Sequence, residues 1–231
     1  MRCDPEVTVK ETTYDALLEA DGLRALAEAG APVPAVLEAT SARLVMTTVS
    51  GGNGWAALGR SLASLHRTVG PSFGWRHDNV IGPLPQSNTW TEDWPGFYIE
   101  HRLRPWMDAV SGGLRDRLDR VCDTVLPRLL DHHPVPSLVH GDLWSGNVVD
   151  GSWLIDPAVS YSDREVDLAF ATLFGGIPVP FFDAYHDTWP LDPGWKERRP
   201  ALQLYHLLVH IELFGSTYVP LLEDRLAAVE T

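Results

Sequence analysis

The sequence contains few of the residues that indicate a disulfide scaffold or a nucleic-acid binder. Its 231 residues include two cysteines, Cys3 and Cys122, which cannot form a disulfide framework and fit a reducing cytosol. Basic residues are scarce, since 18 Lys and Arg stand against 31 Asp and Glu. The resulting net charge of −13 excludes an electrostatic grip on nucleic acid over the whole surface.

Long apolar runs are also missing. The longest, such as 207–209, are far shorter than the roughly 20 residues of a membrane-spanning helix, and residues 1–5 have no hydrophobic signal region. We therefore expect a soluble cytoplasmic protein that has neither a membrane nor nucleic acid among its partners.

The composition that remains is ordinary for a globular protein, 45% hydrophobic, in a chain long enough for one large domain or two lobes. Strand-like stretches and one helical pattern occupy the first 50 residues, and mostly helical patterns occupy the rest. The glycine-rich stretch 51–54 separates the two parts. The pattern predicts an α+β chain with a small β-rich lobe over 1–50 and a larger, mainly helical lobe over 51–231. Two lobes joined by a hinge usually hold a ligand in the cleft between them.

One segment carries the clearest chemical signal. An apolar strand ends at His140, Asp142 follows, Asn147 comes five residues after this aspartate, and Asp156 follows a short hairpin. Phosphoryl transfer requires a carboxylate near the attacking hydroxyl, and an amide oxygen and a second carboxylate that hold Mg²⁺ against the phosphates. Protein kinases use the same spacing between the catalytic Asp and the Asn. Asp142 and Asn147 would alternatively only cap turns in a glycine-rich loop, but the joint pattern favours a phosphotransferase.

A family resemblance rests first on the stretch HGDLWSGN at 140–147. This stretch resembles the catalytic loop of the fructosamine-3-kinase (ketosamine-3-kinase) family, within the aminoglycoside- and choline-kinase-like group of protein-kinase-like folds. The Trp two residues after the Asp separates the family from the wider group. Further family-like stretches lie at 84–88 with Trp90 and Trp94, at 164–169 with 174–176, at 182–185 and at 214–218. The resemblance covers nearly the whole chain and implies a two-lobed protein-kinase-like fold.

The resemblance implies roles for the residues of the cleft. Asp142 is expected to orient or deprotonate the acceptor hydroxyl, and Asn147 and Asp156 are expected to hold Mg²⁺. Lys10, one of only two lysines in the chain, is similar to the lysine that contacts the α- and β-phosphates of ATP, and Glu19 to its ion-pair partner. Taken alone, a strand lysine and a helix glutamate are usually solvent-exposed surface residues.

Other roles follow from the same resemblance. His140 is expected to support the catalytic loop by hydrogen bonding, and Asp167 to fix that loop from the start of a helix, where the helix dipole also stabilises a carboxylate. The adenine of ATP is expected to lie at the hinge, and the residues predicted there are Met46, Thr47, Thr48 and Val49.

The substrate contacts are less clearly marked in the sequence. The candidates are Trp144, Gln86, Asn88 and Trp94. Sugars stack on indole faces, which favours a role for tryptophan. Clustered tryptophans are nevertheless more often part of a core than a ligand platform, so a structural role is the alternative.

One part of the family pattern has no counterpart in this sequence. Kinase-like small lobes begin with two strands and a phosphate-covering loop before the lysine strand, whereas Lys10 is the tenth residue. Either those strands are truncated, or another chain supplies them, or the protein is a natural short form with poor nucleotide affinity. The truncated lobe would leave 7–10 as an exposed edge strand, which we expect to be covered by a disordered tail or in a homodimer.

The sequence therefore predicts an ATP- and Mg²⁺-dependent kinase that phosphorylates the 3-hydroxyl of a fructosamine (ketosamine). The substrate is expected to be a small ketosamine or a protein-bound glycated amine. Two alternatives stay open. One is a kinase of the aminoglycoside or choline type. The other is a catalytically impaired, pseudokinase-like binding protein, because the phosphate-covering loop has no counterpart.

Overall fold

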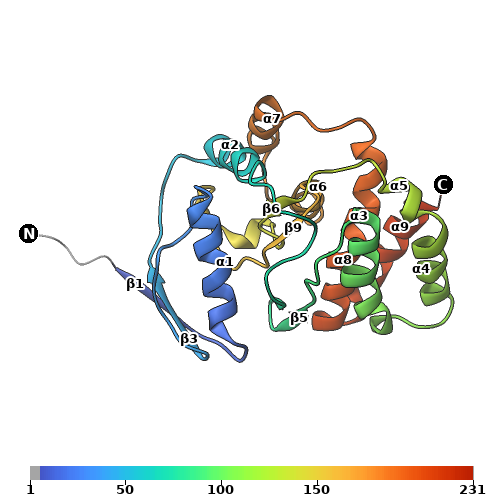
Figure 1. Cartoon of the computed structure of the whole chain (residues 1–231), viewed down its shortest axis with the longest axis horizontal. Coiled ribbons are helices and arrows are strands. Elements are labelled where there is room, and N and C mark those ends of the chain that lie inside the picture. Colours follow the sequence, from blue (N-terminus) through green and yellow to red (C-terminus); the bar gives the residue numbers. More distant parts are fainter. Residues whose placement is uncertain (1–5, 231) are drawn as a thin grey trace, which may run out of the picture.

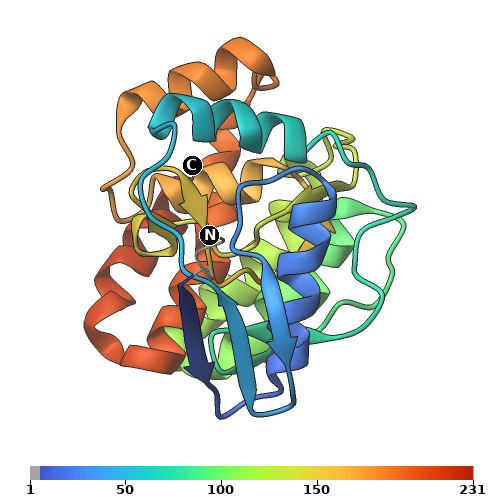
Figure 2. The same cartoon turned by 90° about the vertical axis from the view of Figure 1, so that its left-hand side faces the viewer.

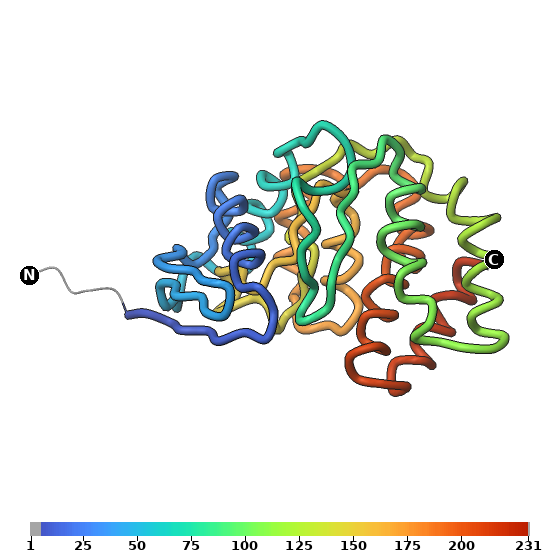
Figure 3. Tube along the Cα trace, turned by 60° about the horizontal axis from the view of Figure 1, so that its bottom comes forward, coloured from blue at the N-terminus to red at the C-terminus, as the bar shows by residue number. Residues whose placement is uncertain are grey.

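The computed structural model describes residues 6–230, so Cys3 lies outside the described range. Figure 1 shows two parts along the long axis, a small sheet with one helix on the left and a group of helices on the right. The tube in Figure 3 shows the same arrangement, with the blue N-terminal and the red C-terminal segments at opposite ends. The α+β, two-lobed organisation expected from the sequence is therefore present.

The small lobe is a three-stranded antiparallel sheet with a helix behind it (Figure 2). Its elements are β1 (Val7–Glu11), α1 (Ala16–Glu28), β2 (Val36–Ala39) and β3 (Arg43–Thr47). The strand order is β1-β3-β2, and Lys10 pairs with Leu44 of the central strand. Helix α1 begins after Asp15, whose side chain accepts a hydrogen bond from the Leu17 N–H at 3.0 Å, as an N-cap does. Within residues 6–230 β1 pairs with β3 alone, and its coverage in a homodimer stays a prediction.

The large lobe consists mainly of helices. They are α2 (Trp55–Leu65), α3 (Trp94–Tyr98), α4 (Gly112–Thr124), α5 (Leu126–Leu129), α6 (Glu165–Ala171), α7 (Val179–Thr188), α8 (Trp195–Phe214) and α9 (Val219–Val229). Shorter helical turns are η1 (Ile99–Leu103), η2 (Arg104–Ala109), η3 (Ser145–Asn147) and η4 (Ser216–Tyr218). In the part of the chain that the structure describes, no helix combines the length and the apolar character needed to cross a membrane.

Three short strand pairs lie between the helices. They are β4 (Asn79–Ile81) with β5 (Leu84–Gln86), β6 (Ser137–Val139) with β9 (Ser160–Ser162), and β7 (Val148–Val149) with β8 (Trp153–Leu154). In the second pair Val139 lies opposite Ser160. Consequently the residues that follow β6 and the residues that precede β9 lie side by side, which brings the segment after His140 next to the segment after Asp156.

The apolar core consists of two clusters whose boundary does not coincide with the boundary between the predicted lobes. One cluster lies within the large lobe around α8. The other joins Leu23 and Leu26 of α1 to Leu58 of α2, Leu138 of β6 and Phe181 of α7. Burial of apolar surface is the main stabilising contribution, so the small lobe is stabilised by packing on the large one. The boundary near residue 50 thus marks a change of secondary structure rather than a division of the core.

Buried charges anchor the start of α6. Arg198 donates from Nε and Nη2 to the two carboxylate oxygens of Glu165 at 2.8 and 2.6 Å, and both side chains are buried. Next to them, Nε2 of His132 lies 3.1 Å from Oδ2 of Asp163. Pairing offsets the cost of removing these charges from water. The first turn of α6, which carries Asp167, is therefore held in place.

Helices α2 and α7 approach each other most closely at Gly59. A Cβ at this position would lie 2.2 Å from the Phe181 carbonyl oxygen, so the spacing requires glycine. Gly113, near the start of α4, is also helical, but nothing lies within 4 Å of the corresponding Cβ position. The two glycines thus differ in packing and not in secondary structure.

We expect Gly59→Ala and Gly113→Ala to change stability in opposite directions. Alanine favours an unobstructed helix by up to about 1 kcal/mol, so Gly113→Ala should hold or raise the Tm. Gly59→Ala should force α7 away, at a cost of about 1–3 kcal/mol, or roughly 3–10 °C in a chain of this size. Scanning calorimetry measures both changes. A Tm for Gly59→Ala at or above that of the parent would contradict the close approach.

Candidate active site

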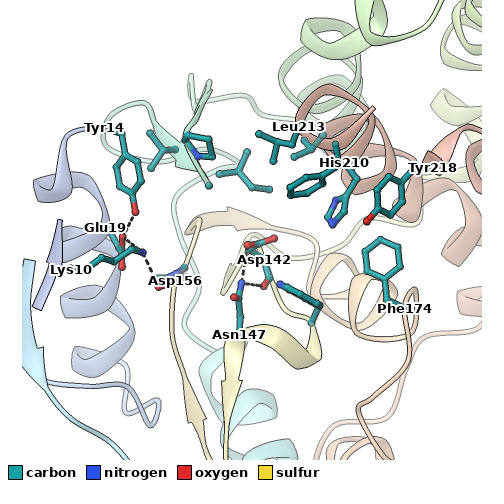
Figure 4. Close-up of a pocket in the computed structure, with 18 residues that line it drawn as sticks. Lys10, Tyr14, Glu19, Asp142, Asn147, Asp156, Phe174, His210, Leu213 and Tyr218 are labelled. Atoms are coloured by element: carbon teal, nitrogen blue, oxygen red, sulfur yellow. Dashed lines mark hydrogen bonds and ion pairs between the residues drawn. The ribbon is translucent and has the colours of Figure 1, made fainter. Parts of the chain in front are cut away.

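A cavity of about 580 Å³ lies between the small lobe and α8. Figure 4 shows its two ends, a charged end formed by β1 and α1 and an aromatic end formed by α8 and its neighbours. Asp142 and Asn147 lie between the two ends. The polar side chains that line the cavity are those of Lys10, Tyr14, Glu19, Asp142, Asn147, Asp156 and His210. The catalytic, metal-holding and phosphate-contacting residues expected from the sequence therefore converge on one cavity.

Lys10 is the centre of the charged end. Its Nζ donates to Oε2 of Glu19 at 2.8 Å and to Oδ1 of Asp156 at 2.9 Å. The expected pair of Lys10 and Glu19 is therefore formed, and the lysine also reaches the second carboxylate. The hydroxyl of Tyr14 donates to the same Glu19 oxygen. Tyr14 has no counterpart among the residues predicted from the sequence.

Neighbouring charges shift the pKa values of Lys10 and Glu19 at the charged end. Burial would lower the pKa of Lys10, but the charges and hydrogen bonds of Glu19 and Asp156 raise it above its ordinary value. Burial raises the pKa of Glu19, opposed by the charge of Lys10. Glu19 is 3% exposed, and its Oε1 has no hydrogen-bond partner within the described residues. The lysine is thus a permanent positive charge at the cavity wall.

Asp142 and Asn147 form the middle of the site. The Asn147 side-chain Nδ2 donates to the Asp142 carboxylate Oδ2 at 2.8 Å and to the Asp142 carbonyl at 2.9 Å. Both amide hydrogens are therefore used within the loop, which leaves the Asn147 side-chain oxygen as an acceptor. Burial raises the pKa of Asp142 to about 7, and the hydrogen bond from Asn147 opposes this shift. A carboxyl with such a pKa is suited to accept a proton near neutral pH.

The catalytic loop is held from below by Asp167. Its two carboxylate oxygens accept hydrogen bonds from the N–H groups of His140 and Gly141 at 2.7 and 2.8 Å. Burial alone would raise the pKa of Asp167, but the hydrogen bond and charge of His66, which lies 3.1 Å away, lower it. The second nitrogen of His66 bonds the Tyr185 hydroxyl at 2.8 Å. His66 and Tyr185 are supporting residues that sequence reasoning does not identify.

Two histidines fix the same loop through backbone carbonyls. His140 Nε2 donates to the Ile155 carbonyl at 3.0 Å, just before Asp156. His206 on α8 donates from Nε2 to the Gly141 carbonyl at 2.9 Å. Burial lowers the pKa of both, that of His206 to about 3, so each stays neutral. The contact with the Ile155 carbonyl is the kind of hydrogen bond expected for His140 as a loop-supporting residue, and this role stays a prediction.

The second carboxylate of the site has an unusual backbone. Asp156 has a φ of 54°, a left-handed conformation that costs a non-glycine residue roughly 1 kcal/mol or more. Its side chain reaches Lys10 on one side. Such a conformation persists only where the surrounding structure holds it.

The aromatic end is formed by Trp144, Phe174, His210, Phe214 and Tyr218, and we use this name for these five residues. The ring centres of Phe174 and His210 lie 4.8 Å apart, and those of His210 and Tyr218 lie 5.1 Å apart. Of the five, only Trp144 is among the substrate residues expected from the sequence. The family-like stretches 174–176 and 214–218 contain Phe174, Phe214 and Tyr218, whereas His210 lies in neither stretch.

Three predicted substrate residues do not line this cavity. Gln86, Asn88 and Trp94 are 3%, 1% and 2% exposed. Trp94 packs among Phe73, Phe97 and Tyr98. It is therefore part of the core, which was the alternative to a ligand-binding role. Gln86 and Asn88 bond other buried polar groups. The prediction that these three residues contact the substrate does not agree with the structure. Their side chains point into the interior of the large lobe and are buried there.

The hinge residues lie at the end of β3. Met46 is buried in the core cluster below the sheet, whereas Thr48 is exposed. The N–H groups of Thr47 and Thr48 bond the carbonyls of Ala35 and Glu6. These two donors are therefore already used, and adenine contact with Met46, Thr47, Thr48 and Val49 stays a prediction.

Comparison with known proteins agrees with this geometry. A sequence profile described as fructosamine kinase matches residues 7–229. A probable ketoamine kinase from Synechocystis sp. is 43% identical over 172 residues, which span 71% of this chain but only 58% of that relative. A probable ketoamine kinase from Enterococcus faecium is 39% identical over 224 residues, which span 91% of this chain and 80% of that relative.

Solved structures confirm the fold. The crystal structure of a candidate fructosamine-3-kinase from Thermobifida fusca has a TM-score of 0.90 at 36% identity and covers 97% of this chain and 85% of that one. A choline/ethanolamine kinase family protein from Mesorhizobium loti, at 14% identity and a TM-score of 0.62, shares the fold alone. The profile match over 7–229 and the 39% identity over 91% of the sequence show that this chain belongs to the fructosamine kinase family.

Proposed function

We propose that this chain is an ATP-dependent kinase that phosphorylates the 3-hydroxyl of a fructosamine (ketosamine). The observation that carries the proposal is the convergence of Lys10, Asp142, Asn147 and Asp156 on one cavity. These groups are the lysine, the carboxylate and the metal-holding pair that phosphoryl transfer requires. The printed names of the relatives, ketoamine kinase and fructosamine-3-kinase, support the substrate class.

The charged end is the proposed phosphate site. Lys10 would contact the α- and β-phosphates of ATP, exchanging its contact with Asp156 for one with the nucleotide while Glu19 keeps it in place. The donor set beside it, the Asn147 side-chain oxygen and the Asp156 carboxylate, consists of the hard oxygen ligands that Mg²⁺ prefers. Bound there, Mg²⁺ would neutralise charge on the phosphates.

Asp142 is the proposed acceptor of the hydroxyl proton. The substrate hydroxyl oxygen would bond to the γ-phosphorus, the bond from this phosphorus to the ADP oxygen would break, and the hydroxyl proton would pass to the Asp142 carboxylate. Hydrogen bonds from Asn147 and the support of the loop by Asp167 hold this carboxylate in place. Positioning of this kind supplies much of the rate in phosphoryl transfer.

The aromatic end is the proposed substrate side. Its Trp144 ring offers a face on which a sugar ring stacks. Nδ1 of His210 donates to the His206 carbonyl at 2.7 Å, and burial lowers the pKa of His210. Nε2 of this neutral imidazole is therefore available to accept a hydrogen bond from the substrate. Phe214 is 62% exposed, and the amine portion of the substrate, free or protein-bound, would extend past it toward solvent.

The two alternatives receive less support. A pseudokinase-like binding protein would be expected to have lost some of the five groups, yet Lys10, Glu19, Asp142, Asn147 and Asp156 are all present and line one cavity. A kinase of the aminoglycoside or choline type would use the same site. Profiling ADP release with a ketosamine, an aminoglycoside and choline separates these substrates, and the ketosamine should be preferred.

Asp142→Asn should slow turnover strongly and increase stability. Loss of the proton acceptor should lower kcat by about 10²–10⁴-fold, while ATP affinity stays within about threefold. Because burial raises the pKa of Asp142, its ionised form is destabilising at neutral pH, and the neutral amide should raise the Tm by a few degrees. ADP release with a fructosamine, ATP titration and calorimetry measure these effects. Asp183→Asn, at an exposed position on α7, is the control, and full activity of Asp142→Asn would refute the assignment.

The pH dependence should report Asp142 directly. Its pKa of about 7 means that the protonated, inactive fraction grows as the pH falls through neutrality. We therefore expect kcat/KM to be level above about pH 8 and to fall about tenfold per pH unit below pH 6.5. Steady-state rates from pH 5.5 to 9 test this, with circular dichroism at each pH to confirm folding. A profile that is level down to pH 5.5 would show that the carboxyl is not the group whose ionisation limits the reaction.

Asp156→Ala should remove the dependence of nucleotide binding on Mg²⁺. In the parent chain, ATP affinity should be at least tenfold higher with Mg²⁺ than with a chelator, whereas in the variant the two affinities should be equal within about twofold, since Asn147 alone remains to hold the ion. Isothermal titration with and without Mg²⁺ measures the ratio. Retention of the parental ratio would exclude Asp156 as a metal-holding residue, and Asp183→Asn again serves as the control.

A further inference from the structure

The base of the β4–β5 hairpin holds three buried amide side chains, which we call the amide cluster: Asn79, Gln86 and Asn88. Nε2 of Gln86 and Nδ2 of Asn88 both donate to Oδ1 of Asn79, at 2.9 and 2.7 Å. The three are 5%, 3% and 1% exposed. The turn of the same hairpin, residues 80–83, lines the active-site cavity. The cluster thus lies behind the site without reaching the substrate side.

The amide cluster bonds the backbone that follows Asp156. Nε2 of Gln86 donates to the Ala158 carbonyl at 3.2 Å, and Nδ2 of Asn79 donates to the Val159 carbonyl at 2.8 Å. From the other side, the Ala158 N–H donates to the His140 carbonyl at 2.9 Å. The chain two and three residues after Asp156 is therefore tied both to the hairpin and to the catalytic loop.

Two further residues orient these amides. The hydroxyl of Tyr205 donates to Oε1 of Gln86 at 2.6 Å, which leaves Nε2 of Gln86 to face the Ala158 carbonyl. Arg102 donates to Oδ1 of Asn88 at 2.7 Å and lies 4.5 Å over the Phe97 ring. Its guanidinium is 4% exposed and forms no ion pair with a carboxylate among residues 6–230. A buried charge without an acidic partner is costly unless it is hydrogen-bonded, and Arg102 also donates to the carbonyls of Ser87 and His101.

The segment bonded by the amide cluster begins just after Asp156. This residue has a φ of 54°, which an L-residue adopts only when its surroundings enforce it. The carbonyls bonded by the cluster come directly after this turn. A rotation of the segment would carry the Asp156 carboxylate away from Lys10 and Asn147.

We propose that Gln86 and Asn79, oriented by Tyr205, Asn88 and Arg102, are positioning residues that hold Asp156 in the conformation in which it binds the metal ion. The proposal rests on the proposed function only for the role of Asp156. Gln86, Asn79 and Asn88 therefore support metal binding and do not contact the substrate. We expect their loss to weaken metal-dependent nucleotide binding more than it weakens substrate binding.

The test uses Gln86→Glu with Gln203→Glu as its matched control. Gln203 is also 3% exposed and also donates from Nε2 to a backbone carbonyl, that of Ala169 at 2.9 Å, but this carbonyl lies in α6 and away from Asp156. In each variant an ionised carboxylate would face a carbonyl oxygen. Loss of general fold stability should therefore be similar in the two.

Three measurements distinguish positioning from stability. The Mg²⁺ concentration for half-maximal ATP binding should rise at least tenfold for Gln86→Glu and less than twofold for Gln203→Glu at pH 8. KM for the fructosamine should change less than twofold in both. Lowering the pH to 6 should shrink the defect of Gln86→Glu relative to the parent chain, because the protonated carboxyl again offers a donor to the Ala158 carbonyl.

A readout without nucleotide keeps the two proposals separable. In the nucleotide-free chain, the Ala158 N–H, which donates to the His140 carbonyl, should exchange at least tenfold faster in Gln86→Glu and at the parental rate in Gln203→Glu. If the parent chain binds no ATP, the proposed function fails, and the exchange data alone decide the positioning role. Equal exchange in the two variants, or an unchanged Mg²⁺ requirement of Gln86→Glu in a chain that binds ATP, would overturn the positioning role.

Discussion

The catalytic loop of this chain depends on one buried carboxylate. Asp167 has no solvent exposure, and it accepts hydrogen bonds from the N–H groups of His140 and Gly141 and pairs with His66. A buried, ionised carboxylate is strongly destabilising unless donors surround it, so the loop backbone has to stay where these donors meet it. Because Asp142 follows directly, the position of the carboxylate that we propose as the proton acceptor follows from that of Asp167.

Around Asp167, several residues of the candidate site have locally unfavourable environments or conformations. Burial raises the pKa of Asp142 to about 7, which destabilises its ionised form, and Asp156 has a left-handed backbone. At Gly141, a Cβ would lie 2.0 Å from the Ala158 carbonyl oxygen, so the two catalytic segments touch backbone to backbone. Unfavourable local conformations persist where surrounding contacts enforce them, and here the packing of both core clusters and the buried polar groups provide those contacts.

Local pattern explains why much of the fold is predictable from the sequence. The strand expected over 7–10 is β1 (Val7–Glu11), and the mainly helical part expected over 51–231 begins with α2 (Trp55–Leu65). Asp142 and Asn147 are five residues apart, so their hydrogen bond follows from loop geometry. Gln86 and Trp94 differ from expectation because residue type and family-like sequence do not say which way a side chain points, and both point into the core.

The sequence by itself determined the α+β pattern and the segment at 140–156, because each is a local pattern or a motif of fixed spacing, whereas the pair of Lys10 and Glu19 was implied only by the family resemblance. Only the tertiary structure decided which remote side chains serve this segment. The bond of Tyr205 to Gln86 joins residues 119 apart, and that of Gln86 to Ala158 joins residues 72 apart. Such partners are chosen by packing in three dimensions, which leaves no spacing rule in the chain.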